Sequence, residues 1–428
     1  MMHTVAAPAR GARFRALLVL TLAMLAGMVA RTLLSPVQEL AKADLGLSDN
    51  QIGLIQGMAL ALPVAALAVP IGRLVDRHRR APLLLVLSVL WIGGTVLSGL
   101  AWNFASLFAG RMLVGLGAAG AVPAILSLTA DLSTPERRGR AVMTMVIGQV
   151  VGMSAAFAAG GVLVGMLTPA GGQAGWLGLT AWRATVLLVA ALLLLPTLLL
   201  LRLAEPVRQE RTVDALPNLG PALAELWRLR RLVAPLMVGM ITVNMGDAAA
   251  SVWAVPVLTR SFGLQPAEFG GWMGLLLLVS GAGGTLLGGL LADWGHRRNP
   301  NGGILWGALL GGGLSVPAAF FALAPTVPAF ALLLALLMGG GAVVAVGAAS
   351  AVTLLVPNHL RGLCIGLMGA LGVFVSLGLA PSIVSLLSQL MGGEGYLAAA
   401  LTVVGVVSSL VGTGAFWLAR RAARPRAS

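Results

Sequence analysis

The chain has 428 residues, of which 58% are hydrophobic and only 10% are charged, and its mean hydropathy is +0.95. Soluble domains carry about 25% charged residues, so this composition excludes a water-soluble globular protein. The single cysteine, Cys364, also excludes a framework of disulfide bonds.

Twelve apolar stretches follow one another along the chain, and a helix needs about 20 residues of this kind to cross a bilayer. They run over residues 14–40, 51–71, 82–101, 104–130, 140–167, 183–203, 233–260, 267–291, 303–324, 327–355, 361–390 and 395–419. The stretches are continuous and lack the alternation of a membrane β-strand, so they predict helices and not a barrel. The first resembles a signal peptide, but its apolar sequence continues past Arg31 and predicts an uncleaved span.

Basic residues are distributed unevenly over the predicted loops. The two tails, the loops after spans 2, 4, 8 and 10 and the segment between spans 6 and 7 hold 23 arginines. The opposite loops hold only Lys42, Arg183 and Arg260. Because positive residues gather on the cytoplasmic side, the pattern predicts a multi-pass protein of the inner (plasma) membrane with both termini in the cytoplasm. It leaves no basic patch for a nucleic-acid partner.

The chain carries an internal repeat. The longest hydrophilic segment, residues 204–232, separates six spans in residues 1–203 from six spans in residues 233–428. At an offset of 217 residues the halves match at Gly46-Leu47 and Gly263-Leu264, Gly53 and Gly270, Gly72 and Gly289, Asp76 and Asp293, and Arg80 and Arg297. Parallel repeats of this kind occur in transporters. We therefore expect two pseudo-symmetric six-helix bundles joined by a cytoplasmic linker.

Two copies of one loop motif carry a family resemblance. They occupy residues 72–80, after span 2, and residues 289–298, after span 8. Both resemble the loop motif of the major facilitator superfamily. Matching text at residues 42–48, 135–140, 253–260 and 378–381 is most similar to the spinster-like branch and the neighbouring anion:cation symporters. The resemblance implies the major facilitator fold and transport by alternating access.

The resemblance also implies a gating role for residues at the cytoplasmic helix ends. In the superfamily that it resembles, this motif acts as a latch: its contacts between the halves form in one conformational state and break in the other. The predicted gating residues are Gly72, Asp76, Arg77, Arg80, Asp131, Gly289, Asp293 and Arg297. The alternative interpretation is that these are solvated charges that only set the topology.

Three charged residues lie inside predicted spans, where a charge at the helix centre costs roughly 2.5–3.5 kcal/mol. Arg31 in span 1, Arg111 in span 4 and Asp247 in span 7 fall at a similar depth by helix rise. Polar residues share the helical faces of Arg31 and Asp247. The predicted substrate-binding residues are Arg31, Ser35, Gln38, Arg111, Asn244 and Asp247. The alternative interpretation is static pairing with carbonyl groups or with each other, or snorkelling toward the interface.

Spinster-like relatives carry two acidic residues that this chain lacks. Ala30 precedes Arg31 where they have an Asp, and Ala118 stands where they have a Glu in span 4. The resemblance links both acids with proton coupling. The repeat places Asp247 opposite Ala30, which makes Asp247 the candidate for proton coupling. Coupling to sodium and uncoupled transport stay open as alternatives.

Enzyme chemistry has little support in the sequence. The four histidines fall in predicted loops or the N-terminal tail, no Cys/His set predicts a metal, and no phosphate-binding loop predicts ATP or another cofactor. We predict a secondary active or facilitative transporter that moves a small organic anion or zwitterion, as a monomer in the lipid bilayer. One alternative is a spinster-like transporter of lipids, lysolipids or other amphiphiles. The alternative of another class is a transport-inactive membrane sensor or interaction protein.

Overall fold

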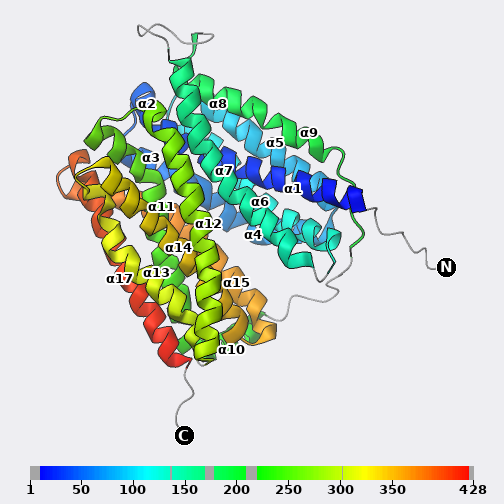
Figure 1. Ribbon diagram of the computed structural model, residues 1–428. Coiled ribbons are helices and arrows are strands. Elements are labelled where there is room, and N and C mark those ends of the chain that lie inside the picture. The colour runs from blue at the N-terminus through cyan, green and yellow to red at the C-terminus, as the bar shows by residue number, and fades with distance from the viewer. Residues whose placement is uncertain (1–9, 135–136, 169–177, 209–218, 301, 424–428) are drawn as a thin grey trace.

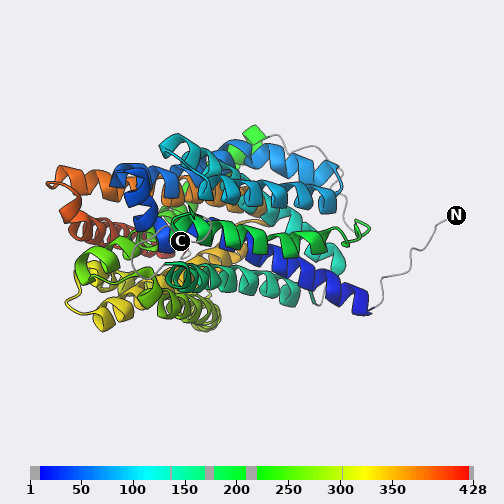
Figure 2. The same ribbon diagram turned by 90° about the horizontal axis from the view of Figure 1, so that it is seen from above.

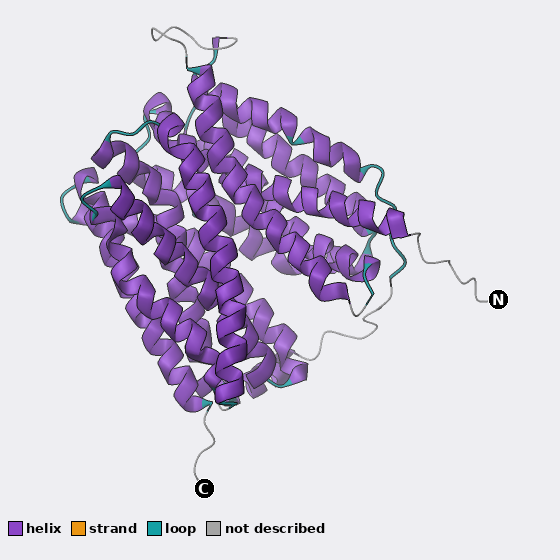
Figure 3. Ribbon diagram, in the orientation of Figure 1, coloured by secondary structure: helices purple, strands orange, loops and turns teal. Residues whose placement is uncertain are grey.

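The computed structural model describes residues 10–134, 137–168, 178–208, 219–300 and 302–423. Within these ranges the secondary structure is helical, without a strand (Figure 3). Twelve helical segments are long and apolar enough to cross a membrane, and they coincide with the twelve predicted spans. The predicted all-α membrane fold is confirmed.

Six spans form the first half of the chain. The first span is α1 (Arg10–Thr32) with α2 (Leu34–Leu45), and the second is α3 (Asp49–Gln56) with α4 (Met58–Arg77). The third to fifth spans are α5 (Arg80–Gly99), α6 (Phe104–Leu132) and α7 (Arg138–Leu167). The sixth span is α8 (Ala181–Leu192) with α9 (Leu194–Leu200).

Six further spans form the second half, after the short helix α10 (Leu219–Arg228). The predicted linker includes α10 and also residues 209–218, which lie outside the described ranges. The next spans are α11 (Arg230–Phe262), α12 (Pro266–Arg298), and η3 (Gly303–Leu305) with α13 (Trp306–Ala318) and η4 (Ala319–Leu323). The last spans are α14 (Val327–Leu355), α15 (Asn358–Gly372) with η5 (Val373–Leu379) and α16 (Ala380–Leu390), and η6 (Glu394–Tyr396) with α17 (Leu397–Ala422).

The two halves form two bundles that meet at one end of the molecule and splay apart toward the other (Figure 1). The start of α1 and the end of α17 lie at the splayed end, which we call the terminal face. The end that carries the α2–α3 and α11–α12 turns is the distal face. Seen from above, the helices of both bundles run across the view in a common direction (Figure 2).

Several spans change their helical geometry within the membrane-spanning length, and three of these contribute residues to the pockets described below. The first is interrupted at Leu33, close to Pro36, which has no N–H to bond the carbonyl one turn earlier. The second is interrupted at Gly57, where a Cβ would lie 2.5 Å from the carbonyl oxygen of Gly378. The eleventh contains the π-helical stretch η5. Such wide turns are frequent at functional sites.

Matching helix ends display the internal repeat. Gly46 closes α2 with φ 63°, and Gly263 closes α11 with φ 69°. Both glycines adopt the left-handed conformation that a side chain would disfavour, and both end the first span of their half. They are one of the pairs predicted at the offset of 217 residues. The two bundles are therefore pseudo-symmetric, as the sequence predicted.

Small residues bring the two bundles into close contact along α7 and α12. A Cβ on Gly161 would clash with the carbonyl oxygen of Pro266, and one on Gly270 would lie 2.7 Å from the Cα of Gly161. The Ser154 hydroxyl donates to the Gly274 carbonyl oxygen at 2.6 Å. Helices can approach this closely only where small residues face each other. This packing of α7 against α12 is one of the contacts that join the first half to the second.

Candidate functional site

Two adjoining pockets that share three lining residues lie between the bundles, and we treat them as two lobes of one cavity. The lobe lined mainly by the first half has a volume of about 370 Å³, and we call it the apolar lobe. The lobe lined mainly by the second half has a volume of about 450 Å³, and we call it the polar lobe. Arg31, Gly369 and Val373 line both lobes and mark their junction. Pockets of this size hold small organic molecules.

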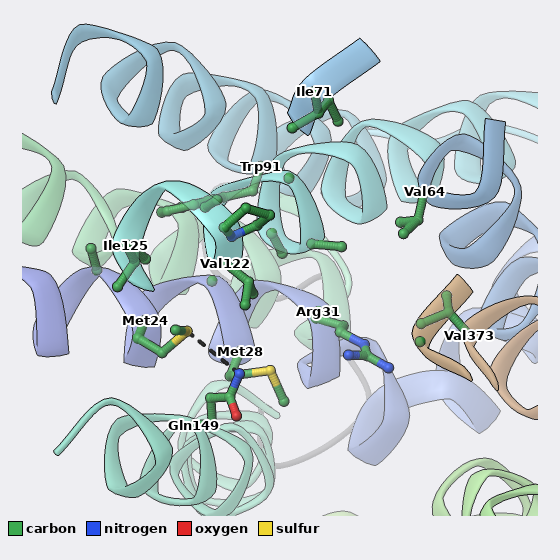
Figure 4. A pocket seen from close by; sticks show the side chains of 18 of the residues that line it. Met24, Met28, Arg31, Val64, Ile71, Trp91, Val122, Ile125, Gln149 and Val373 are labelled. Atoms are coloured by element: carbon green, nitrogen blue, oxygen red, sulfur yellow. Dashed lines mark hydrogen bonds between the residues drawn. The ribbon is translucent and has the colours of Figure 1, made fainter. Parts of the chain in front are cut away.

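The apolar lobe is lined by hydrophobic side chains of α1, α4, α5 and α6. They include Met24, Met28, Val64, Trp91, Val122 and Ile125. Figure 4 shows Arg31 at the end of this lobe that faces Val373 of η5. The amide nitrogen of Gln149 lies 3.5 Å from the sulfur of Met24. Among the described lining residues Arg31 is the only charged one, so this lobe offers apolar surface beside a single cation.

Apolar side chains make up most of the polar lobe as well, and the lobe takes its name from the amide, hydroxyl and carboxylate groups that lie among them. Asn244, Asp247 and Ser251 come from α11, Ser280 comes from α12, and Ser376 comes from η5. The described lining residues of this lobe include two charges, Asp247 and the shared Arg31. The complete cavity thus contains one positive and one negative side chain.

Arg31 reaches the cavity from the last turn of α1. Among the described residues, no group accepts a hydrogen bond or forms an ion pair with its guanidinium, although the side chain is half-buried. A cation held within a membrane span without a protein partner is unfavourable. A bound carboxylate, sulfonate or phosphate would supply charge-assisted hydrogen bonds to this group. Arg31 is therefore suited to bind an anion.

Asp247 faces the same cavity from the second half. Its Oδ1 atom is buried and has no hydrogen-bond partner among the described residues. The carboxylate packs against Gly341 of α14, where an added Cβ would overlap Oδ2. Only glycine at position 341 leaves room for the carboxylate in this orientation.

Arg111 lies outside both lobes. Its side chain is 2% exposed, and its guanidinium donates to the carbonyl oxygens of Ala30 and Arg31 at 3.2 and 2.5 Å. It also donates to the Gln56 side-chain oxygen at 3.1 Å. The sequence placed Arg111 beside Arg31 in the substrate site. The structure brings the Arg111 guanidinium to the main chain of Arg31 instead, where it ties α6 to α1 and α3.

Ser35 and Gln38 are also buried outside the lobes. The Gln56 amide donates to Gln38 Oε1 at 2.9 Å and to Ser35 Oγ at 3.3 Å. The Gln38 amide in turn donates to the carbonyl oxygen of Val252 in α11 at 2.6 Å. We call Arg111, Gln56 and Gln38 the polar chain. Because it ends on α11, the polar chain joins the first half to the second.

Ion pairs join the two halves at the distal face. Arg260 of α11 donates to Glu39 and Asp49 through four hydrogen bonds of 2.7 to 2.9 Å. Lys42 contacts Asp49 at 2.7 Å and Glu394 at 2.5 Å. We call these five residues the distal cluster. Paired contacts of arginine with carboxylates are strong and directional, so the distal cluster holds this face closed.

On the terminal face, the ion pairs of Arg80 join residues of the first half to the start of the linker. Arg80 is 2% exposed and contacts Asp131 at 2.5 Å and Glu205 at 3.0 Å. Burial alone would raise the pKa of Glu205, but hydrogen bonds from the Ala81 and Arg80 N–H groups and the Arg80 side chain lower it. Arg208 caps the carbonyl end of α4. The start of the linker is therefore docked against the α4–α5 turn.

The other predicted gating residues are placed differently. Asp76, Arg77, Asp293 and Arg297 are exposed at the terminal face. A Cβ at Gly72 or Gly289 would meet no atom within 4 Å. Of the predicted gate, the structure thus brings together Arg80 and Asp131.

The family model described as the Major Facilitator Superfamily matches residues 20–320 of the chain. The chain belongs to the Major Facilitator Superfamily. Together with its twelve helices that are long and apolar enough to cross a membrane, this makes it a multi-pass membrane protein of a transporter family.

Two curated relatives and one solved structure illustrate the relationship. The chain is 28% identical over 283 residues to an MFS-type efflux pump of Mycolicibacterium smegmatis, covering 65% of this chain and 62% of that protein. It is 28% identical over 229 residues to the 3-(3-hydroxy-phenyl)propionate transporter of Escherichia coli, covering 52% and 51%. The matches thus span between half and two thirds of these relatives.

The fold is similar to a crystal structure of a bacterial homolog of the human lysosomal transporter Spinster, in an inward-facing and unoccupied conformation. The TM-score is 0.82 at 23% identity, and the match covers 98% of this chain and 100% of that one. The resemblance to the spinster branch of this superfamily is confirmed at the level of the fold.

Sequence reasoning missed several residues that shape the site. Trp91 and Gly341 are uncharged and gave no signal in the charge and hydropathy pattern. The ion pairs of the distal face did give a signal, because Lys42, Arg183 and Arg260 are the basic residues on the side that otherwise lacks them. All three form ion pairs, Arg183 with Asp44 at 2.9 Å. Exceptions to a charge bias thus indicate structural pairing.

Proposed function

We propose that this transporter moves a small organic anion or zwitterion with an apolar body by alternating access. The observation that carries the proposal is the position of Arg31 at the junction of the two lobes, where its guanidinium has no hydrogen-bond or ion-pair partner among the described residues. A substrate would place its anionic group at Arg31 and its hydrocarbon part in the apolar lobe. Asn244 and Asp247 would face the remaining polar groups.

We further propose that the terminal face is cytoplasmic and that the membrane is the inner (plasma) membrane. The excess of arginines on the loops of the terminal face supports this orientation. In this orientation the distal cluster closes the outer side, and the cavity belongs to an inward-facing state. The Spinster homolog of similar fold was captured in a state of that description.

Alternating access would then move residues 1–203 against residues 233–428, with residues 204–232 as the linker. Opening the distal face would require breaking the distal cluster and the hydrogen bond from Gln38 to Val252. Arg80 and Asp131 would form part of the gate on the terminal face. A monomer contains every group that this proposal uses.

Proton coupling would operate through Asp247. It is the only carboxylate among the described lining residues, and it faces the lobe that also contains Arg31. Ala30 and Ala118 carry no ionisable group, so the first half offers no acid at those positions. An acid within a membrane span that faces a polar cavity is a typical proton carrier.

An amphiphile such as a lysolipid is the second candidate substrate. The apolar lobe favours it, because methionines and aliphatic side chains would accommodate an acyl chain. The relative from Escherichia coli is named for an aromatic carboxylate, which favours the smaller anion.

A counterflow experiment tests the proposed function. Purified protein in liposomes would be preloaded with 3-(3-hydroxyphenyl)propionate, phenylalanine or lysophosphatidylcholine, and entry of the labelled compound would be followed. We expect accumulation of the carboxylate, and its loss in Arg31→Ala but not in the exposed control Arg202→Ala. Counterflow of lysophosphatidylcholine alone would favour the amphiphile. Counterflow of none of the three would contradict the proposal.

A further inference from the structure

Three arginines stack on tryptophan rings at the terminal face, where α12 and α17 end and α13 begins. The guanidinium carbons of Arg298, Arg420 and Arg421 lie 4.8, 3.9 and 3.6 Å from the ring centres of Trp294, Trp306 and Trp417. We call these six residues the Arg–Trp cluster. We propose that the Arg–Trp cluster binds the phosphate of an anionic phospholipid. Such a lipid is a partner of the second half that is distinct from the transported substrate, whatever that substrate is.

Glycines bring the three helices of the Arg–Trp cluster together. A Cβ on Gly295 of α12 would overlap the carbonyl oxygen of Gly303 in η3. A Cβ on Gly302 would lie 3.1 Å from the carbonyl oxygen of Arg420 in α17, and Gly302 has a φ of 92°, which a side chain would disfavour. The start of η3 is therefore packed directly against α12 and against the end of α17 (Figure 1). This packing gathers arginines from two separate helices around one point of the terminal face.

The exposed side of α12 changes from aliphatic to aromatic to basic residues along its length. Leu286, Leu290, Trp294 and Arg298 follow one another at intervals of four residues and therefore lie on one side of the helix. Both leucines are 66% exposed, and Trp294 is 46% exposed. Helix rise places the tryptophan about 6 Å and the nearer leucine about 12 Å deeper than the arginine. Because tryptophan favours the headgroup level of a bilayer, the leucines would contact acyl chains and Arg298 would lie at the level of the phosphates.

The exposed side of α17 has the same order of residues. Val407, Leu410 and Trp417 are exposed by 54%, 55% and 44%, and Arg421 follows one turn later. Their spacing keeps them on one side of the helix. Two helices that end beside η3 thus both present apolar, then aromatic, then basic groups toward the terminal face. A phospholipid has the complementary order, from its acyl chains to its anionic phosphate.

The charges at these helix ends are mostly positive. The described last two turns of α12 and of α17 contain Arg297, Arg298, Arg420 and Arg421, with Asp293 as their one carboxylate. Within the described part of the chain, Arg298 and Arg421 form no ion pair, and each contacts the face of a ring. A guanidinium that stacks on a ring keeps the N–H groups at its edge for phosphate oxygens. A zwitterionic headgroup brings a cation of its own, so this site should prefer phosphatidylglycerol to phosphatidylcholine.

Other arginines that stack on tryptophan have additional partners. Arg183 lies 4.7 Å from the ring centre of Trp182 at the distal face, and its charge is paired with Asp44. Arg230 lies 5.6 Å from the ring centre of Trp227 and also donates to the main-chain oxygen of that residue. The described helix ends of the first half at the terminal face contain no tryptophan. The lipid site is therefore a property of the second half and not of the basic terminal face as a whole.

Titration of single lipids onto the full-length protein in detergent tests the proposal. Protein freed of lipid would be titrated with dioleoylphosphatidylglycerol or dioleoylphosphatidylcholine, and bound lipids would be counted by native mass spectrometry. We expect phosphatidylglycerol to bind at least about tenfold more tightly, and millimolar sn-glycerol 3-phosphate to leave it bound. Equal affinity for the two lipids would overturn the inference. Displacement of the lipid by sn-glycerol 3-phosphate would overturn it as well, since the ligand would then be a free phosphate ester.

The double variant Arg298→Gln/Arg421→Gln removes one cation from each of the two helices. Each basic residue beside an anionic lipid contributes about a fivefold gain in affinity, so this variant should bind phosphatidylglycerol about 25-fold more weakly. The matched control is Arg73→Gln/Arg140→Gln, which removes two exposed arginines from the terminal face of the first half and should bind like the wild type. Equal weakening of both variants would show that diffuse charge attracts the lipid, and the inference would fall.

The variant Trp417→Leu separates the ring from the charges. It keeps the arginines and an apolar side chain, so phosphatidylglycerol should bind about two- to fivefold more weakly and phosphatidylcholine should bind as before. Because the substituted side chains are exposed, the lipid-free variants should unfold at the temperature of the wild type, which shows that they are folded. Wild-type affinity for phosphatidylglycerol in both Trp417→Leu and the double variant of α12 and α17 would overturn the inference.

Discussion

At the scale of residues, two arginines of similar depth have different surroundings. Arg31 is half-buried, faces the cavity and lacks a protein partner among the described residues. Arg111 is fully buried and bonded to two carbonyl groups and to Gln56. The depth of both was predictable from helix rise, because it depends only on sequence position. Their surroundings were not, because they depend on how α1, α3 and α6 pack together, and these helices carry residues far apart in the sequence.

Substitution of the two arginines should separate binding from stability. Arg111→Ala leaves the Gln56 side chain without its donor, and each buried acceptor left unpaired costs about 1–3 kcal/mol. We expect its Tm in detergent to fall. Arg31→Ala should keep or raise the Tm while it abolishes anion counterflow. Equal thermal stability of the two variants would contradict these roles.

Gly341 offers a test of the Asp247 position. Gly341→Ala would push the carboxylate out of its contact with α14, because the new Cβ overlaps Oδ2. We expect the KM for the anion to rise roughly tenfold, as for a displaced binding group. Gly313→Ala is the matched control, since a Cβ there meets no atom within 4 Å. A normal KM in Gly341→Ala would contradict the packing of Asp247 described above.

At the scale of elements, the sequence predicted the spans and missed their interruptions. The predicted range 327–355 coincides with α14, and 104–130 differs from α6 by two residues. Hydropathy locates such spans because it depends on how much apolar surface reaches the lipid. It does not distinguish an α-helical turn from a π-helical one, so the break at Gly57 and the stretch η5 were not predicted.

The distal cluster should control which face of the molecule is open. Arg260→Gln removes the cation that bonds Glu39 and Asp49 across the halves, so the distal face should open more often. Distances between spin labels on α2 and α16 would measure this as a larger long-distance population. Arg183→Gln is the matched control, because Arg183 pairs with Asp44 within the first half. Identical distance distributions in all three proteins would rule out a locking role.

Docking of the linker should depend on pH through Glu205. Its pKa is lowered in the folded protein, so its stabilising effect is present above the pKa of the unfolded chain. That effect is lost as the pH falls through the lowered pKa. The Tm of the wild type should therefore exceed that of Glu205→Gln at pH 7, and the two should converge once the pH has fallen below the lowered pKa. A difference in Tm that stays constant over this range would contradict the assignment.

At the scale of the whole molecule, the bundles meet through glycine contacts and the distal cluster. The division into halves was predictable, because matching residues of the two halves are separated by one constant offset of 217 residues. The relative tilt of the bundles was not, because it depends on contacts between residues far apart in the chain, such as Gly161 with Gly270.

The glycine contact between α7 and α12 should be needed for closure of the distal face. Gly161→Val places methyl groups where the main chain of Pro266 lies, so the bundles cannot meet there. We expect net uptake to fall at least about tenfold, since the transport cycle requires closure of each face in turn. Gly139→Val at the start of α7 meets no neighbour and is the control. Wild-type uptake by Gly161→Val would show that this contact is dispensable.

The π-helical stretch η5 has a geometric consequence for the eleventh span. A π-helical turn accommodates one residue more than an α-helical turn. If η5 rewound into α-helix, every residue of α16 would advance by one helical position, which is a rotation of about 100°. Ser385 and Pro381, which now face Gly53 of α3, would then turn away from it. A change of one residue in winding would thus exchange the whole surface that the eleventh span presents to the second.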